Sequence, residues 1–491
     1  MRRALIVLVA AGLAALPAGC GGSHQKPLDE ALGYLPKDTA FVVAIDTDTR
    51  GDQYKKLGRL VRRFPFGEQV VDSLKGEFER TSQVDFDRDV KPLLGNEFVV
   101  GSTSRGSFAG GSVGKSFLGA IKTKDGDKLK DLAKRTGATK QGGRDGATIY
   151  RDKQGTDFAI KGDTLVVAGS RSQLEDAVAR RSGHKGLTRE SFDGGVQGVP
   201  ATALIRGFVD VGGLLRSRRR AAQALRVPWV AALRSFGFSA RAENDGVAVD
   251  FNLRTDRSKL RPDQLPLATG QGAPPIVRRP GEISIGIQNP GQLVDFGLGA
   301  ARAASPQFAA GRRQLEQALG IDLKRDLADQ LSGAGSLNVT TGGGFSARAD
   351  VRDPVAVKRT LRKLAAQLPA FVKSSRGGPV VLTPVGGGLY SLSLPKQQPV
   401  VLGVIGRRLV AATDQARARR FATARAQASP GAKGSLVLAA DARRVVERLV
   451  RRLAPDTGVG VGALTAPLGA LTGSVSSDTG GLRGRLKLEI R

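Results

Sequence analysis

The feature that most constrains the fold is a set of four matches between the two halves of the chain. The segment VDFDRDV at 84–90 recurs as IDLKRDL at 321–327. Three more matches follow in the same order: LVVAGS at 165–170 with LVAATD at 409–414, LIRGFVD at 204–210 with VLAAD at 437–441, and a Gly turn with alternating apolar residues at 245–253 and 480–488. Chance rarely produces an ordered series of this kind. The sequence therefore predicts two homologous repeats, residues 28–256 and 281–491.

The segment between the repeats is rich in proline. It runs from 257 to 280 and holds Pro262, Pro266, Pro274, Pro275 and Pro280. Proline at this density removes backbone donors and favours extended chain, so we expect this segment to be a linker.

Each repeat mixes strands and helices without strict alternation. Strands are predicted at 41–45 and 283–287, and helices at 127–135 and 354–368. Turn signals such as Asp-Gly and Gly-Gly favour hairpins. Within the matched segments, Asp or Ser residues (Asp85, Ser170, Asp322 and Asp414 among them) are placed to cap the helices that follow. We expect an α+β fold in each repeat, a largely antiparallel, twisted sheet with helices packed on one face.

The first 19 residues are typical of an export signal. Arg2 and Arg3 precede an apolar run at 4–16, which is too short to span a membrane, and small residues lead to Cys20. This ending resembles the lipobox of bacterial lipoproteins, although Pro17 occupies a position where leucine is usual. The resemblance implies a signal peptide at 1–19, lipidation of Cys20 with acyl chains such as palmitate, and a tether at 20–27. It places the protein on the extracytoplasmic face of the bacterial membrane. The alternative is an ordinary cleaved signal with an incidental cysteine.

A second resemblance begins where the first repeat begins. The segment LPKDTAFVVAID at 35–46 resembles the opening of a family of bacterial envelope lipoproteins known only as a domain of unknown function. This resemblance implies no activity and no site residues.

The composition excludes several kinds of chemistry. Cys20 is the one cysteine and there are two histidines, so disulfides, a thiolate nucleophile and a His-rich metal cluster are not expected. The segment 109–116, AGGSVGKS, lacks the first glycine of a phosphate-binding loop and leads into a strand pattern. Asp85, Asp87 and Asp89 have carboxylate spacing without the Gly and Glu of a calcium loop. We therefore expect no enzyme, no metal and no cofactor.

The unusual global property is a formal charge of +31. Two arginine clusters stand out, one on the helix expected after Asp210 and one on its counterpart after Asp441: Arg216, Arg218, Arg219 and Arg220, then Arg443, Arg444, Arg448, Arg451 and Arg452. In the second cluster the arginines and the apolar residues occupy different helix faces. We expect contact with anionic lipid or acidic wall polymer, the alternative being a solvated face in a basic protein. Aromatic residues make up 5% of the chain, which argues against nucleic acid.

These observations favour a membrane-anchored, non-catalytic binding or interaction protein of the cell envelope that uses a basic surface. The alternative is a carrier that holds a lipid or another apolar ligand in a groove between sheet and helices. The sequence names no protein partner.

Overall fold

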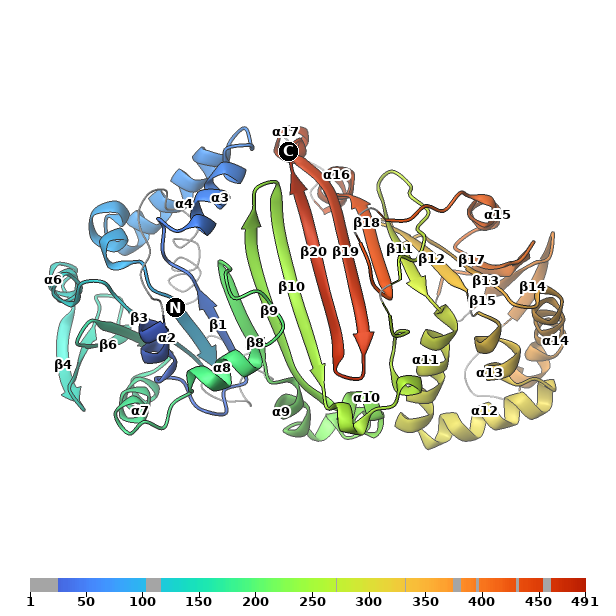
Figure 1. Ribbon diagram of the computed structural model, residues 1–491, viewed down its shortest axis with the longest axis horizontal. Coiled ribbons are helices and arrows are strands. Elements are labelled where there is room, and N and C mark those ends of the chain that lie inside the picture. The colour runs from blue at the N-terminus through green and yellow to red at the C-terminus, as the bar shows by residue number, and fades with distance from the viewer. Residues whose placement is uncertain are drawn as a thin grey trace. The chain divides into compact units, whose positions relative to one another are not determined.

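The computed structural model describes residues 25–102, 116–270, 272–331, 333–373, 381–393, 397–429, 432–453 and 461–491 (Figure 1). The predicted signal peptide, Cys20 and residues 109–115 lie outside the described residues. The chain divides into two compact units. Unit 1 comprises residues 1–219, 234–254 and 490–491, and unit 2 comprises 220–233 and 255–489. Each unit is α+β and is built on a large antiparallel sheet.

Unit 1 is organised around a ten-stranded sheet. Its strands are β1 (Phe41–Ile45), β2 (Phe98–Ser102), β3 (Phe117–Lys122), β4 (Thr139–Arg144), β5 (Ala147–Arg151), β6 (Asp157–Lys161), β7 (Thr164–Ala168), β8 (Ile205–Val209), β9 (Leu233–Glu243) and β10 (Gly246–Thr255). Their spatial order is β4-β5-β6-β7-β3-β2-β1-β8-β9-β10. The pairings from β4 to β9 are antiparallel, as expected from the hairpin turns.

Helices cover both faces of this sheet, so the expectation of helices on one face was wrong. On one face, α2 (Gln25–Leu32), α7 (Arg171–Ser182) and α8 (Arg189–Gly195) bury Leu28, Leu174 and Phe192 against inward residues such as Val42 and Val99. The other face carries α4 (Gly67–Ser82), η1 (Phe86–Val90), η2 (Lys91–Leu93) and α6 (Gly126–Arg135). Successive strand residues point to opposite faces, so a strand that is buried at every position, such as β2, contributes side chains to two cores. Helix α3 (Asp52–Val61) precedes α4, and α9 (Val211–Arg216) follows β8.

Unit 2 has a sheet of the same size. Its strands are β11 (Glu282–Gln288), β12 (Ala334–Thr340), β13 (Phe345–Asp350), β14 (Val381–Gly386), β15 (Leu389–Ser393), β16 (Val400–Ile405), β17 (Arg408–Ala412), β18 (Leu436–Asp441), β19 (Leu468–Asp478) and β20 (Gly481–Ile490). Their order is β14-β15-β16-β17-β13-β12-β11-β18-β19-β20. Strand by strand, this is the order seen in unit 1.

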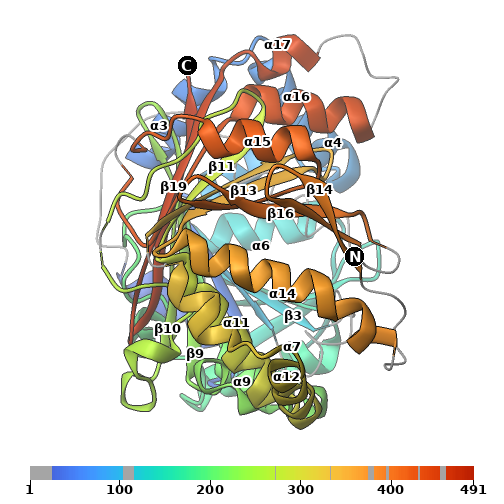
Figure 2. The same ribbon diagram turned by 90° about the vertical axis from the view of Figure 1, so that its right-hand side faces the viewer.

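The sheet of unit 2 is also covered on both faces, as Figure 2 shows for α15 and α14. Ala418 and Ala422 of α15 (Gln415–Thr423) pack against Val410 and Ala412. On the other face, α14 (Pro354–Lys373) and α11 (Pro290–Ala304) pack through Val357, Leu361 and Val294. Helices α12 (Pro306–Leu319) and α13 (Leu323–Asp326) with η8 (Ala328–Gln330) complete the connection from β11 to β12. Helix α16 (Ala442–Leu453) contacts β18, β19 and α17 (Val461–Thr465).

The proline-rich segment expected to connect the repeats packs on unit 2. Leu265 and Ile276 are fully buried, and Ile276 forms a bridge with Gln427. Side chains of β12 hold this segment, because Ser336 Oγ donates to the Pro275 carbonyl at 2.8 Å and Asn338 Nδ2 donates to the Val277 carbonyl at 2.9 Å. Its short helical turns are η6 (Arg257–Lys259) and η7 (Pro262–Gln264). Unit 2 also includes most of η4 (Arg219–Ala221), and η5 (Ala224–Arg226) and α10 (Pro228–Ala231), which lie inside the range predicted for the first repeat.

The predicted helix caps are confirmed. Asp85 accepts a hydrogen bond from the Arg88 amide at 2.8 Å, and Asp322 accepts from the Lys324 amide at the same distance. Ser170 and Asp414 cap α7 and α15 in the same way. In the ranges that the structure describes, no helix is both long and apolar enough to cross a bilayer.

Candidate functional site

The VDFDRDV segment of unit 1 forms a compact cluster of hydrogen bonds. The Glu79 carboxylate, near the end of α4, accepts from the Phe86 amide at 3.0 Å. The Asp85 amide donates to Asp89 Oδ2 at 3.3 Å. Arg88 Nε then donates to Asp89 Oδ1 at 3.1 Å. Two of the three aspartates noted in the sequence, Asp85 and Asp89, are thus occupied by backbone amides and arginine.

The IDLKRDL segment of unit 2 forms the same cluster of hydrogen bonds. Glu316 of α12 accepts from the Leu323 amide at 3.0 Å, and the Asp322 amide donates to Asp326 Oδ2 at 2.9 Å. Arg325 Nε donates to Asp326 Oδ1 at 2.8 Å. No group of histidine, cysteine, aspartate or glutamate suited to a metal ion is found among the described residues.

Asp89 also joins two elements of unit 1. It is 8% exposed, and Arg135 of α6 donates to its Oδ1 at 2.9 Å. The hydrogen bonds from Arg88, and after them those from Arg135, lower the pKa of Asp89 to about 2. The pair fixes η1 beside α6.

Next to this pair, an apolar cavity of about 190 Å³ lies between the sheet and its helices. The strands β1, β2, β3 and β7 supply its floor: Ile45, Phe98, Ile121, Leu165 and Val167. The helical elements supply the opposite wall, including Phe78, Phe86, Val90, Leu129 and Leu132.

Two threonines are the polar residues of this lining, and both hydroxyls are already engaged. Thr47 Oγ1 donates to the Asn96 carbonyl and accepts from the Gly95 amide at 3.0 Å. Thr123 Oγ1 donates to the Asp163 carbonyl at 2.7 Å. The cavity can therefore contact a ligand through its shape and its apolar side chains, because both lining hydroxyls already have hydrogen-bond partners. Sequence reasoning raised an apolar groove as an alternative but did not identify these residues.

The helix that closes one side of the cavity carries an exposed apolar stripe. Phe66, Val70 and Leu74 are 49%, 52% and 44% exposed. They follow one another at a spacing of four residues, and the next position in this series is Phe78, which lines the cavity. One face of α4 thus leads from solvent to the cavity wall.

The first predicted arginine cluster does not lie on one helix. Arg216 is the last residue of α9, Arg218 follows it, and Arg219 begins the short turn η4. Arg220 belongs to unit 2, whereas the other three belong to unit 1. All four are exposed, and no ion pair involving them is seen in the described part of the chain.

The second cluster lies on α16 as predicted, but most of its members have partners. Arg443 pairs with Glu447 at 2.9 Å, and Arg444 pairs with Asp441 at 3.3 Å. Arg448 Nη1 donates to the Gly281 carbonyl at 3.0 Å, and Arg452 donates to the Thr341 carbonyl. A guanidinium that donates to a carbonyl keeps its charge, so these contacts fix where the charge lies without cancelling it.

Helix α16 is amphipathic, and its apolar side is incompletely covered. Ala442 and Val445 are buried, whereas Leu449 is 39% exposed. The adjacent α17, which Figure 2 shows beside α16, carries Leu464 with 47% exposure. Thr465 Oγ1 donates to Glu447 Oε1 at 3.0 Å and so links the two helices. Exposed leucines thus occur on a pair of helices that carry five arginines.

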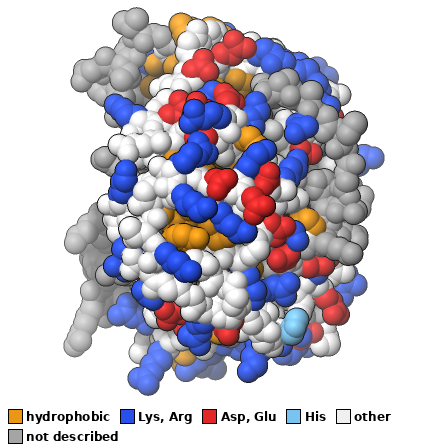
Figure 3. Space-filling view, turned by 90° about the vertical axis from the view of Figure 1, so that its left-hand side faces the viewer, with side chains coloured by type: hydrophobic (Ala, Val, Ile, Leu, Met, Phe, Trp, Pro, Cys, Tyr) orange, Lys and Arg blue, Asp and Glu red, His pale blue; other side chains and the backbone are white. Residues whose placement is uncertain are grey.

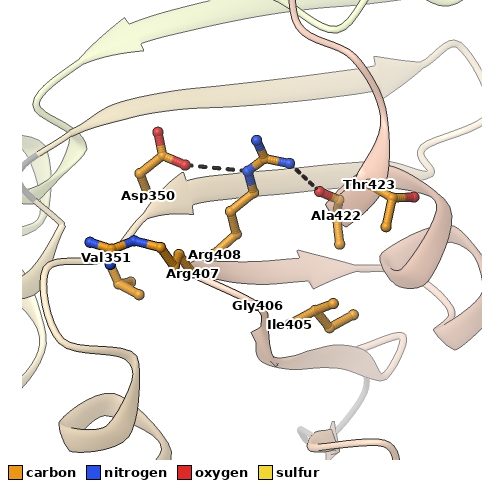
Figure 4. A pocket seen from close by; sticks show the side chains of 8 residues that line it. All are labelled: Asp350, Val351, Ile405, Gly406, Arg407, Arg408, Ala422 and Thr423. Atoms are coloured by element: carbon orange, nitrogen blue, oxygen red, sulfur yellow. Dashed lines mark hydrogen bonds and ion pairs between the residues drawn. The ribbon is translucent and has the colours of Figure 1, made fainter.

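In unit 2, an open cavity of about 730 Å³ is lined by residues of β13, β16, β17 and α15 (Figure 4). Arg408 lies between the Asp350 carboxylate, 3.3 Å from its Nε, and the carbonyl of Ala422 near the end of α15. Thr423 supplies the hydroxyl group of this lining, with no histidine or cysteine beside it. Asp350 and Arg408 thus pair with each other, and Arg408 also satisfies a helix terminus.

Figure 3 looks onto a face of unit 1 and shows a different surface. Basic and acidic side chains are mixed there around a small hydrophobic patch. The net charge of +31 therefore does not produce a uniformly basic surface.

Comparison with known proteins supports the resemblance of the first part of the chain to a domain of unknown function. Residues 3–192 match a family model described as "Protein of unknown function (DUF3352)". No curated protein matches the chain. Crystal forms III and I of TP0453 are similar to 47% of this chain at 12% and 13% identity, each with a TM-score of 0.27, and the matches cover 82% and 81% of those chains.

Proposed function

We propose that the protein is a non-catalytic lipoprotein of the extracytoplasmic membrane face whose basic surface docks on anionic lipid. Residues 1–19 are its signal peptide, Cys20 carries the lipid, and residues 20–27 are the tether. The observation that carries the proposal is the exposure of Leu449 and Leu464 on two helices that carry five arginines. A helix with an apolar side and an arginine-rich side is the form that binds at a bilayer interface.

The energies involved favour lipid over a featureless solvated face. Each Lys or Arg near an anionic surface contributes on the order of 1 kcal/mol, and full burial of a leucine contributes roughly 1.5–3 kcal/mol. The arginines supply long-range attraction, while the leucines add contact with the acyl region. An acidic wall polymer would use the arginines but would gain little from the leucines. The exposed arginines Arg216, Arg218 and Arg219 of unit 1 and Arg220 of unit 2 are proposed to contact anionic lipid as well.

The proposal includes a tandem duplication within the chain. Two observations support it. The strand order is the same in the two units, and the hydrogen-bond cluster of Glu, Asp, Arg and Asp recurs with the same hydrogen bonds. The LPKDT opening at 35–39 lies in the first copy, inside the range that matches the family model.

The test uses mature protein carrying Cys20→Ser, so that binding does not depend on the lipid anchor. It is sedimented with phosphatidylcholine vesicles, with and without phosphatidylglycerol. Binding should need the anionic lipid and weaken steeply with salt. The double variant Leu449→Ser/Leu464→Ser should bind about tenfold more weakly. Val355→Ser is the matched control, because Val355 is a 61% exposed apolar residue on α14 of the same unit. Equal binding by the double variant and the control would overturn the docking surface.

A further inference from the structure

We infer that the cavity of unit 1 is a binding site for a single alkyl chain, either the end of a free fatty acid or one tail of a lipid. This inference goes beyond docking at a lipid surface, since it assigns a ligand to the interior of a different unit. It stands on the lining, the size and the surroundings of the cavity.

The residues that line the cavity favour a ligand whose buried part is apolar. Aliphatic and phenyl groups of Ile45, Phe98, Ile121 and Leu165 form the floor. The hydroxyls of Thr47 and Thr123 already donate to backbone carbonyls. A polar ligand would lose its hydrogen bonds to water on entry without replacement, and this loss would oppose binding. An alkyl chain makes no hydrogen bonds to water and therefore loses none on entry.

The volume limits how much of a ligand can enter. A dry apolar cavity of roughly 150 Å³ accommodates benzene, and pockets for drug-sized ligands measure roughly 300–1,000 Å³. At about 190 Å³, this cavity is too small for a whole lipid. It is large enough for the terminal part of one chain, with the polar end of the ligand left outside.

Two features of the surroundings suit a binding site. Ion pairs fix the helical wall of the cavity, and an exposed apolar stripe on α4 leads toward the cavity. Asp89 and Arg135 hold η1 to α6 at 2.9 Å, and the ion pair between Lys75 and Asp87 holds α4 to η1. The exposed stripe Phe66, Val70 and Leu74 continues along α4 to Phe78 in the cavity wall. A chain moving along this stripe would remain in apolar contact as it enters.

A simple packing void is the competing explanation. An unfilled apolar cavity loses dispersion contacts on all its walls, so natural cores contain few voids of this size. The two explanations differ in one measurable property. A site that opens to solvent binds a chain whose polar end stays outside, whereas a closed packing void cannot hold such a chain.

The experiment titrates the mature protein carrying Cys20→Ser with decanoic acid, and separately with monomeric dihexanoyl phosphatidylcholine, by calorimetry. Saturable 1:1 binding of either ligand supports the inference. The ligand that binds more tightly shows whether the chain comes from a fatty acid or from a phospholipid. The absence of binding by both overturns the inference. No bilayer is present, so this result is independent of docking through α16.

Two variants locate the binding in the cavity. Val167→Phe fills the floor and should weaken binding at least tenfold, whereas Val355→Phe, on the exposed surface of α14, should leave it unchanged. If Val167→Phe does not fold, Phe78→Ala gives the opposite change: it enlarges the cavity and should shift the preference toward longer chains. Binding that is unaffected by both cavity variants would place the ligand elsewhere and overturn the assignment.

Discussion

The carboxylate of Asp89 on η1 lies 2.9 Å from a guanidinium nitrogen of Arg135 on α6. This ion pair joins two elements that are far apart in the sequence and both line the apolar cavity. A change at either residue should therefore alter both the stability of unit 1 and the shape of the cavity.

Asp89→Asn should lower the free energy of unfolding by about 1–2 kcal/mol at neutral pH, because it removes hydrogen bonds to two charged groups. The folded-state pKa of Asp89, about 2, is below its ordinary value of 3.8. The stabilisation is thus complete above pH 4 and is lost as the pH falls toward 2. Urea unfolding between pH 2 and 7 measures the difference. Asp127→Asn, at an exposed carboxylate of α6, is the control. A difference from wild type that persists undiminished at pH 2 would contradict the assignment.

Gly281→Ala should destabilise unit 2 by more than its backbone conformation alone requires. Gly281 has φ +73°, and a Cβ there would lie 2.4 Å from the guanidinium carbon of Arg448. We expect a loss of about 1–2 kcal/mol. Gly343→Ala is the matched control, since Gly343 has φ +86° and open space around its Cβ position. The two melting temperatures should differ, and equal shifts would show that Arg448 moves away at no cost.

Mutations in the two hydrogen-bond clusters should lower the stability of the protein by similar amounts. Glu79→Gln and Glu316→Gln each weaken a 3.0 Å hydrogen bond to a backbone amide, and each should cost about 1 kcal/mol. The residues belong to different compact units, so the losses should add in the double variant. Thermal unfolding of the single and double variants measures this. A large effect at one site with none at the other would argue against equivalent roles.

Cys20→Ser should move the protein from the membrane fraction to the soluble or secreted fraction. The reason is chemical, because the thiol that would carry the lipid is absent in the variant. Cell fractionation followed by immunoblotting gives the result. Unchanged processing and membrane retention in the serine variant would refute the anchor.

Polar substitution of the α4 stripe should slow transfer of an alkyl chain from vesicles to the cavity. In Val70→Ser/Leu74→Ser, the exposed apolar side chains are removed while the cavity lining remains intact. Stopped-flow transfer of a fluorescent fatty acid should be several-fold slower, with little change in affinity for the free acid. Val355→Ser again serves as the control, and equal transfer rates would show that the stripe is not the entry path.

Local patterns predicted local structure well. Strands at 41–45 and 283–287 follow from short runs rich in β-branched residues, and the caps at Asp85, Ser170, Asp322 and Asp414 follow from side-chain chemistry within a few residues. The placement of helices was wrong because a strand such as β2, which begins with three consecutive apolar residues, is compatible with one covered face or two. The sequence pattern of such a strand does not distinguish the two arrangements.

The candidate sites depend on contacts between residues distant in the sequence, which periodicity cannot reveal. The pairing of Arg448 with the Gly281 carbonyl spans 167 residues. The apolar pattern of α4 predicts a buried face, yet it does not show that Phe66 is exposed while Phe78 is buried. Phe78 is buried because Phe86 of η1 and Leu132 of α6 belong to the cluster in which it packs. The hydroxyls of Thr47 and Thr123 likewise have partners only in the folded chain.

The path of the chain between the two units limits how the protein can be divided. Residues 220–233 belong to unit 2 although they lie between two parts of unit 1, and residues 490–491 return to unit 1. The proline-rich segment is also bound to unit 2 through Ser336 and Asn338. A single cut by a protease, or a single stop codon, therefore cannot release two complete units. A gene fragment that ends near residue 256 would keep a piece of unit 2 with no sheet to pack on. The two units should therefore be produced and degraded together.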